Sequence, residues 1–305
     1  MSQVGAPRHD PIPIGEIAQP PFAKSPDPGV LFQQRADRFQ ALADGHVLAP
    51  YLRFLATLSD IQHRLQEALA EPDMPAPETR DRAREHAMPP LDRGHFTADA
   101  SFDATFERLV SLAAAIDMPE AARAALQRTK AASIAERDEM ARAVLADAIP
   151  VEALADHLFV AAALQVHFAR LAARLDARRL VAVGDGACPA CGGPPVASMV
   201  VGWQGAHNTR FCACSLCATQ WNYVRIKCTL CGSTAGISYK TIDGGSDEVR
   251  AEVCEDCRGY VKILQQVQNP GLDAVADDVA SLALDLLVRE LGYRRGAVNP
   301  FLLGY

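Results

Sequence analysis

Apolar residues recur every three or four positions through most of residues 30–183, which is the spacing of helices with one buried face. Ser101 can cap one such helix, and Ser133 with Glu136 has the spacing of a capping box. The segments that follow the helical pattern are residues 31–42, 50–69, 102–112, 119 onward, 133–145 and 151–175. The last is apolar on most faces, so we expect it at the centre of a helical bundle.

Two proline-rich stretches interrupt this pattern. Residues 1–29 hold seven of the twenty prolines and show no apolar period, which predicts an extended arm. Residues 72–90 are also rich in proline and predict a connector between the early helices and the later ones. The helical domain is therefore expected over residues 30–183.

The pattern changes at Gly184. Beyond it glycines and β-branched residues are frequent, and all nine cysteines of the chain lie there. Residues 197–201 suit a strand, and Gly244-Gly245 suits the turn of a hairpin. A final helical stripe runs from Leu272 to Leu291 and ends at Gly292, a plausible cap. Because that stripe must be buried, we expect the helix to pack on the preceding module or on the bundle. The predicted fold class is α+β, mainly α.

Eight of the cysteines form four Cys-x-x-Cys pairs that repeat with an offset of forty residues. The pairs are Cys188/Cys191, Cys214/Cys217, Cys228/Cys231 and Cys254/Cys257. The offset indicates a tandem duplication, with a first module over residues 184–227, a second over 228–268, and a C-terminal helix and tail over 269–305. The repeat favours pairing within each copy over the crossed alternative. Cys212 has Glu252 as its repeat mate, so we interpret it as a spare thiol.

This spacing is typical of metal binding, because two intervening residues let a tight turn aim both sulfurs at one ion. Gly192 and Gly232 follow two of the turns and tolerate the left-handed backbone that such turns adopt. We therefore predict two four-cysteine sites, in which basic residues can offset the thiolate charge. The candidates are Arg210, Arg225, Lys227 and Arg250. Four disulfides, or isolated thioredoxin-like redox pairs, fit less well.

Charge and hydropathy narrow the possible partners and the cellular location of the protein. The net charge of −7 disfavours nucleic acid as a partner. The most apolar stretch, residues 151–175, is interrupted by polar residues, so we expect no membrane insertion and a cytoplasmic location. His157 and His167 lie on this stretch and are interpreted as core or boundary histidines. Closed four-cysteine sites leave no open metal position, and no catalytic motif is present, so an enzyme is not predicted.

Several segments resemble the formate dehydrogenase accessory protein FdhE family. The similar segments are residues 50–54 (PYLRF), 188–192 (CPACG), 214–221 (CSLCATQW), 224–228 (VRIKC), 251–257 (AEVCEDC), 275–278 (VADD) and 299–302 (NPFL). The resemblance implies a cytoplasmic, non-enzymatic maturation factor that binds the catalytic subunit of respiratory formate dehydrogenase. It also implies two rubredoxin-like iron sites held by all eight paired cysteines, within a duplicated rubredoxin-like or zinc-ribbon module.

Spacing alone does not separate iron from zinc, since both accept four thiolates. We expect iron on the resemblance, with zinc as the alternative. Two other functions stay open beside the accessory role. One is a rubredoxin-like protein that passes single electrons during enzyme maturation. The other is a purely structural role, in which the metals only stabilise the fold of a small domain. The sequence does not indicate an oligomeric state.

Overall fold

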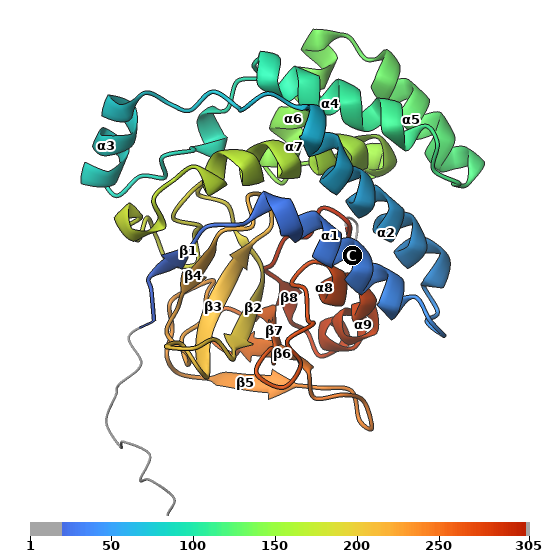
Figure 1. Cartoon of the computed structure of the whole chain (residues 1–305). Coiled ribbons are helices and arrows are strands. Elements are labelled where there is room, and N and C mark those ends of the chain that lie inside the picture. The colour runs from blue at the N-terminus through green and yellow to red at the C-terminus, as the bar shows by residue number, and fades with distance from the viewer. Residues whose placement is uncertain (1–19, 303–305) are drawn as a thin grey trace, which may run out of the picture.

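Seven α-helices span the first part of the chain in this computed structural model, which describes residues 20–302 (Figure 1). They are α1 (Pro28–Leu42), α2 (Ala49–Arg64), α3 (Pro77–Glu85), α4 (Ala100–Ala113), α5 (Glu120–Ala131), α6 (Ile134–Leu145) and α7 (Leu154–Ala173). Short 3₁₀ turns lie between them at η1 (Leu65–Ala68), η2 (Arg93–His95), η3 (Val151–Ala153) and η4 (Ala177–Arg179). The predicted helical segments are confirmed.

Helix α7 is the centre of the helical part, as predicted. It packs against α1, α2, α4, α5 and α6. Among residues 20–302, the helical stretch Val151–Ala173 is the one whose length and composition would suit a membrane span, and most of it is buried inside the protein. Burial by neighbouring helices accounts for its apolar faces.

Two local predictions need correction. Helix α4 is capped by Asp99, whose carboxylate accepts from the Phe102 amide, and Ser101 lies inside its first turn. Helix α3 lies within the predicted connector and has no buried residue. It forms because Pro77 suits a first turn and most of the residues that follow (Glu, Arg and Ala) are good helix formers. Such a helix carries no apolar stripe that would signal it. The Ser133–Glu136 capping box of α6 is present as predicted.

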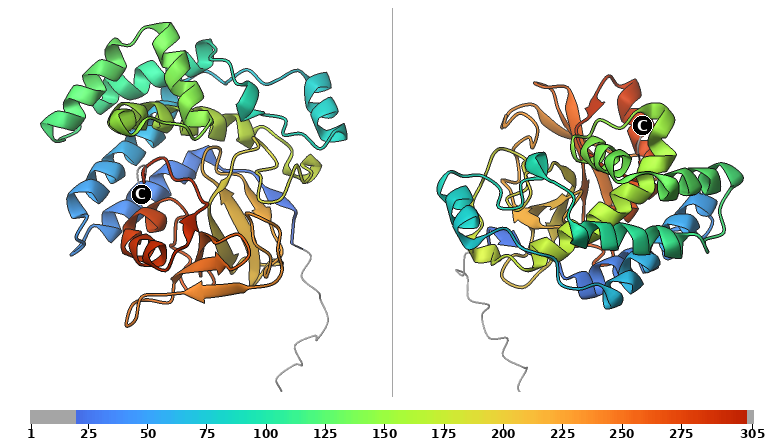
Figure 2. Two further views of the ribbon diagram at one scale, coloured as in Figure 1. Left: turned by 180° about the vertical axis from the view of Figure 1, so that it is seen from behind. Right: turned by 90° about the horizontal axis from the view of Figure 1, so that it is seen from above.

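The second part of the chain forms one eight-stranded sheet beneath the layer of α4–α7, as Figures 1 and 2 show. Its strands are β1 (Ala23–Lys24), β2 (Pro195–Val201), β3 (Thr209–Cys214), β4 (Gln220–Asn222), β5 (Ile237–Lys240), β6 (Val249–Cys254), β7 (Gly259–Leu264) and β8 (Arg294–Arg295). The order is β1-β4-β3-β2-β7-β6-β5, and β8 pairs with β7. Residues 1–19 of the predicted arm lie outside the described residues, whereas β1 pairs with β4.

The sheet repeats itself in the manner that the cysteine offset predicts. Cys212 lies opposite Trp221 in the β3–β4 pair, and Glu252 lies opposite Val261 in the β6–β7 pair. Both pairings carry the same offset of forty residues. The two copies meet where β2 runs parallel to β7, with Ser198 paired to Ile263. The duplicated modules therefore form a continuous sheet.

The C-terminal helix is broken into α8 (Ala276–Ala280) and α9 (Leu282–Glu290), whereas one helix was predicted over residues 272–291. At the break the Asp277 carbonyl still accepts from the Ser281 amide (3.0 Å), but side chains also bond the carbonyls of the last turn of α8. The Ser281 hydroxyl donates to Asp277 O (2.6 Å), and Lys262 Nζ donates to Asp278 O (2.8 Å). Gly292 adopts the left-handed backbone expected of a cap.

The two modules have different cores. The large core joins the helices to the first module and includes Phe211, Cys212 and Trp221. A small second core joins the second module to α9, which therefore packs on that module. Its members are Ala251, Val253, Tyr260, Leu284, Val288 and Tyr293. The first module is thus enclosed by the helical layer, whereas α9 packs on the second.

Candidate metal centre

The first cluster brings together Cys188, Cys191, Cys214 and Cys217, whose sulfurs all lie within 4.8 Å of one another. Cys188 Sγ and Cys217 Sγ are 3.6 Å apart, and Cys191 Sγ and Cys214 Sγ are 3.4 Å apart. All four residues are buried. The strand β3 delivers the second pair beside the turn that precedes β2.

The second cluster brings together Cys228, Cys231, Cys254 and Cys257, again within 4.8 Å. The Sγ atoms of Cys228 and Cys257 are 3.8 Å apart, and those of Cys231 and Cys254 are 3.7 Å apart. Here Cys231 is exposed and Cys257 is half-buried. The grouping in both clusters is the sequential pairing favoured by the repeat.

These dimensions fit a four-thiolate metal site. A tetrahedron with metal–sulfur bonds of about 2.3 Å has sulfur–sulfur edges of about 3.8 Å. The measured separations are 3.4–3.8 Å. Each cluster can therefore hold one metal ion with only small adjustments of the side chains.

A residue with a left-handed backbone follows each of the four Cys-x-x-Cys turns. Gly192 (φ +78°) and Gly232 (φ +73°) were expected in this role. Ala218 (φ 58°) and Arg258 (φ 55°) hold the equivalent positions in the other two turns and were not predicted. Their side chains give no signal for such a backbone, and only their place directly after a Cys-x-x-Cys pair, as for Gly192 and Gly232, could have revealed it.

Backbone groups turn toward the sulfurs in both clusters. The Leu216 amide donates to Cys214 Sγ, and the Leu230 amide donates to Cys228 Sγ, each across 3.4 Å. Burial raises the pKa of the Cys188 thiol, and that of Cys228 to about 12. Both thiols must therefore release a proton when they become metal-bound thiolates.

The helical part closes over the first cluster through residues that sequence reasoning missed. The Leu91 amide donates to Ala190 O (2.9 Å), and the Arg93 amide donates to Cys191 O (3.1 Å). From the other side, Gln165 Nε2 of α7 donates to Ser215 O (2.9 Å). These contacts hold both turns of the first cluster, and no sequence pattern links residues so far apart.

The second cluster is held by the C-terminal elements instead. Tyr293 donates to Glu255, which also accepts from Arg258 Nη1 (2.5 Å). The Arg258 guanidinium lies over the Tyr293 ring at 4.0 Å, and its Nη2 donates to Leu291 O (2.9 Å). These contacts fix one side of the cluster and leave Cys231 open to the solvent.

Cys212 lies outside both clusters, as predicted, and its sulfur is 3.6 Å from Ser198 Oγ. Burial raises the pKa of this thiol to about 11. Its neighbour Arg210 is also buried and forms an ion pair with Glu252 (2.8 Å), which joins β3 of one module to β6 of the other. Glu252 occupies, in the second copy, the position that Cys212 occupies in the first. The Arg210–Glu252 ion pair therefore joins the two copies of the repeat.

The four basic residues proposed to offset the thiolate charge donate elsewhere among the described residues. Arg210 bonds Glu252, and Lys227 bonds Asp185 (2.5 Å). Arg225 bonds Asn208, and Arg250 lies near Asp247 (3.6 Å). The observed partners of the sulfurs are therefore backbone amides and the Thr219 hydroxyl, which lies 3.2 Å from Cys217 Sγ.

The two histidines of α7 are core residues away from both clusters. His157 Nδ1 contacts Ala153 O at 2.8 Å. His167 is 1% exposed and lies among the rings of Phe96, Phe102 and Phe168. Burial lowers the pKa of His167 to about 4, so it is neutral in the folded protein at pH 7.

The sequence matches three parts of one protein family. Residues 20–185 match "FdhE, N-terminal", residues 187–225 match "FdhE, central domain", and residues 226–302 match "FdhE, C-terminal domain". Together these matches span the described part of the chain.

Individual FdhE proteins are also similar to this chain over most of its length. The protein FdhE homolog of Rhizobium meliloti (strain 1021) is 49% identical over 299 residues, or 97% of each chain. Protein FdhE of Escherichia coli (strain K12) is 34% identical over 278 residues, which cover 89% of this chain and 88% of that one. The crystal structure of the FdhE protein from Pseudomonas aeruginosa superposes with a TM-score of 0.83 at 34% identity, covering 93% of this chain and 99% of that one.

Proposed function

This chain belongs to the FdhE family, and on that premise we propose that it is a non-catalytic accessory protein needed for active respiratory formate dehydrogenase. In this role it binds the catalytic subunit of that enzyme in the cytoplasm. The observation that carries the proposal is the pair of four-cysteine clusters on one continuous sheet, within a chain that is similar to FdhE proteins over nearly its full length.

The metal ligands in this proposal are the eight paired cysteines. We assign iron to both clusters on the family resemblance, with zinc as the alternative, since the thiolate tetrahedron suits either. A bound ion would stabilise the fold, and iron would add the capacity to change charge by one electron. Because four thiolates close the coordination shell, the clusters support a docking or sensing role better than hydrolysis.

The two clusters differ in solvent exposure, which supports a different role for each. The first is enclosed between the sheet and α7, which suits a structural site. The second presents Cys231 at the surface, where a partner protein can approach the thiolate shell. We therefore place the docking surface for the catalytic subunit around the second cluster.

Deletion of the gene from a host with a membrane formate dehydrogenase tests the accessory role. The expected result is loss of formate oxidation in the membrane fraction, with recovery when the gene is supplied on a plasmid. Unchanged activity in the deletion strain would refute the role. Co-purification of the catalytic subunit with tagged wild-type protein tests the partner, and its absence from the eluate would remove that part of the proposal.

A rubredoxin-like electron carrier is the second candidate function, because Cys231 is exposed as an electron-transfer contact requires. Voltammetry of the iron-loaded protein separates the two functions. A reversible one-electron wave that is lost in Cys231→Ser would favour the carrier. Absence of a wave in a protein that still restores formate dehydrogenase would leave docking as the function.

A further inference from the structure

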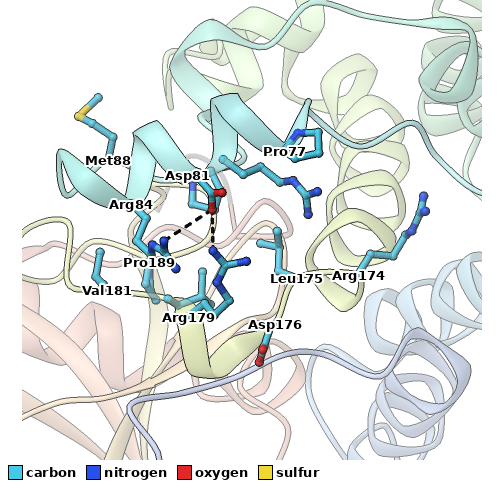
Figure 3. A pocket seen from close by; sticks show the side chains of 13 residues that line it. Pro77, Asp81, Arg84, Met88, Arg174, Leu175, Asp176, Arg179, Val181 and Pro189 are labelled. Carbon is cyan, nitrogen blue, oxygen red and sulfur yellow. Dashed lines mark hydrogen bonds and ion pairs between the residues drawn. The ribbon is translucent and has the colours of Figure 1, made fainter.

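A pocket of about 200 Å³ lies beside the first cluster and concentrates positive charge (Figure 3). Four arginines line it: Arg80 and Arg84 from α3, and Arg174 and Arg179 from the chain around η4. Its lining includes Pro189, which lies between the first two cysteine ligands in the sequence. None of these arginines has a role in the metal centre or in the proposed docking.

Carboxylates pair with three of these four arginines, and Arg80 is left over. Two aspartates line the pocket, against four guanidinium groups. Asp81 is shared between Arg179 (2.6 Å) and Arg84 (3.7 Å), as the dashed lines in Figure 3 show. Asp176 is held by both arms of Arg178, which does not line the pocket (3.0 Å each). Arg174 is paired outside the lining with Glu71 (3.3 Å), and its Nη1 donates to Pro72 O. Arg80 is therefore the lining arginine without an ion pair among residues 20–302.

Arg80 gives the most specific signal. Its guanidinium makes no hydrogen bond and no ion pair with any of residues 20–302, and its Nε atom is buried without an acceptor. Buried polar groups in proteins are nearly always paired, so a buried donor that lacks an acceptor indicates a missing partner. An anion in the pocket would supply that acceptor.

The shape and the remaining lining define the kind of anion. Guanidinium groups form paired hydrogen bonds with phosphate and carboxylate oxygens, and four of them around one pocket suit the several oxygens of a phosphate group. The lining also includes the apolar side chains of Leu175, Leu180 and Val181, which suit an organic substituent. We propose that this pocket binds the phosphate group of a small phosphate monoester. The proposal does not depend on the accessory role.

A consequence for the fold follows from the position of the pocket. Helix α3 has no buried residue and is attached to η4 by the Asp81–Arg179 pair, whose side chains are both about half exposed. A phosphate group held by arginines from α3 and from the chain around η4 would fasten this helix beside the first cluster. Backbone amide exchange in residues 77–85 is therefore expected to slow when the ligand binds.

The test is calorimetric titration of the metal-loaded protein with inorganic phosphate and with phenyl phosphate, at constant ionic strength. Saturable binding of both is expected, and phenyl phosphate should bind at least as tightly as inorganic phosphate. Arg80→Gln should weaken phosphate binding about tenfold, because it removes a charged hydrogen bond. Since Arg80 has no partner among the described residues, the substitution breaks no observed ion pair.

Arg82→Gln is the matched control, because Arg82 is exposed on the same helix and does not line the pocket. It should bind phosphate like the wild type, and Arg84→Gln provides a second pocket variant. Metal content is measured in every sample, so that loss of the first cluster is not mistaken for loss of the pocket. Equal binding by Arg80→Gln and wild type, equal affinity for acetate, or exclusion of phenyl phosphate would each overturn the proposal.

Discussion

The side-chain amide of Gln165 donates a hydrogen bond to the backbone carbonyl of Ser215 across 2.9 Å. Gln165 lies on the central helix α7, and Ser215 lies between the two cysteines of a metal-binding turn. Gln62 of α2 donates in turn to Gln165 Oε1 (3.2 Å), and all three residues are buried. This contact joins the helical core directly to the first cluster.

Replacing Gln165 should therefore loosen the first cluster as well as the helical core. Gln165→Leu leaves Ser215 O buried without a donor, which costs about 1–3 kcal/mol of unfolding free energy. Urea unfolding of the metal-loaded protein measures the loss. Gln127→Leu, at an exposed position of α5, is the control and should change stability by less than about 0.5 kcal/mol. Equal stability of the two variants would refute the link.

Metal content should distinguish ligand cysteines from the spare one. Cys191→Ser is expected to reduce the metal from two ions per chain to one, because the first site loses a thiolate. Cys212→Ser should keep both ions, since Cys212 lies outside both clusters. Elemental analysis of protein purified without oxygen measures this. Loss of an ion from Cys212→Ser would contradict the assignment of the ligands.

The two sites should release metal at different rates. Cys231 is exposed, whereas all four cysteines of the first cluster are buried, so a chelator reaches the second site first. A chromogenic chelator in excess should give two kinetic phases of equal amplitude. Cys228→Ser is expected to remove the fast phase, and Cys188→Ser the slow one. The reverse assignment would show that burial does not control access.

The buried Arg210–Glu252 pair should couple the stability of the two modules. Glu252→Ala leaves Arg210 charged and buried, and is expected to cost about 3–5 kcal/mol. The repeat supplies a matched control in Asp247→Ala, which removes the exposed partner of Arg250 and should cost at most about 1 kcal/mol. Thermal unfolding compares them. Similar costs for the two variants would mean that the buried pair adds nothing.

His167 should make stability fall in mild acid. The pKa of His167 is lowered to about 4 in the folded protein, whereas an unfolded histidine titrates near 6.5. Between these pH values the unfolded chain binds a proton that the folded chain does not. The contribution of His167 to the free energy of unfolding is therefore fully present above pH 6.5, and the free energy falls by about 3 kcal/mol toward pH 4.

His167→Gln should remove that part of the pH dependence, whereas His86→Gln, at an exposed position, should keep the wild-type slope. Urea unfolding at several pH values between 7 and 4 measures it. Acid release of metal affects all three proteins, so the difference in slope isolates the histidine. Identical slopes for His167→Gln and wild type would refute the prediction.

The sequence predicted the features that depend on local pattern. Helix positions followed from the apolar period, and the grouping of the eight cysteines followed from the offset of forty residues, because a duplicated unit keeps its contacts. The Ser133–Glu136 cap followed in the same way from a three-residue spacing. In each of these cases the interacting residues lie within one element or one repeat.

The features that it did not predict depend on contacts between distant segments. The enclosure of the first cluster rests on Leu91 and Arg93 from the segment between α3 and α4, and on Gln165 from the core helix α7. The break at Ser281 rests on Lys262 of another element. Ala218 takes a left-handed backbone because the metal-binding turn requires it, and its own propensity gives no sign of this.

The parallel pairing of β2 with β7 has a consequence for how this chain can be divided. Each strand forms the outer side of its own copy, and each covers the hydrogen-bonding groups of the other. A fragment that ended after the first module would expose β2 as a free edge of mainly apolar residues, and a fragment holding only the second would expose β7. Free edges of this kind recruit strands from other molecules. Separated halves should therefore aggregate, so the duplicated unit has become indivisible in spite of its repeat.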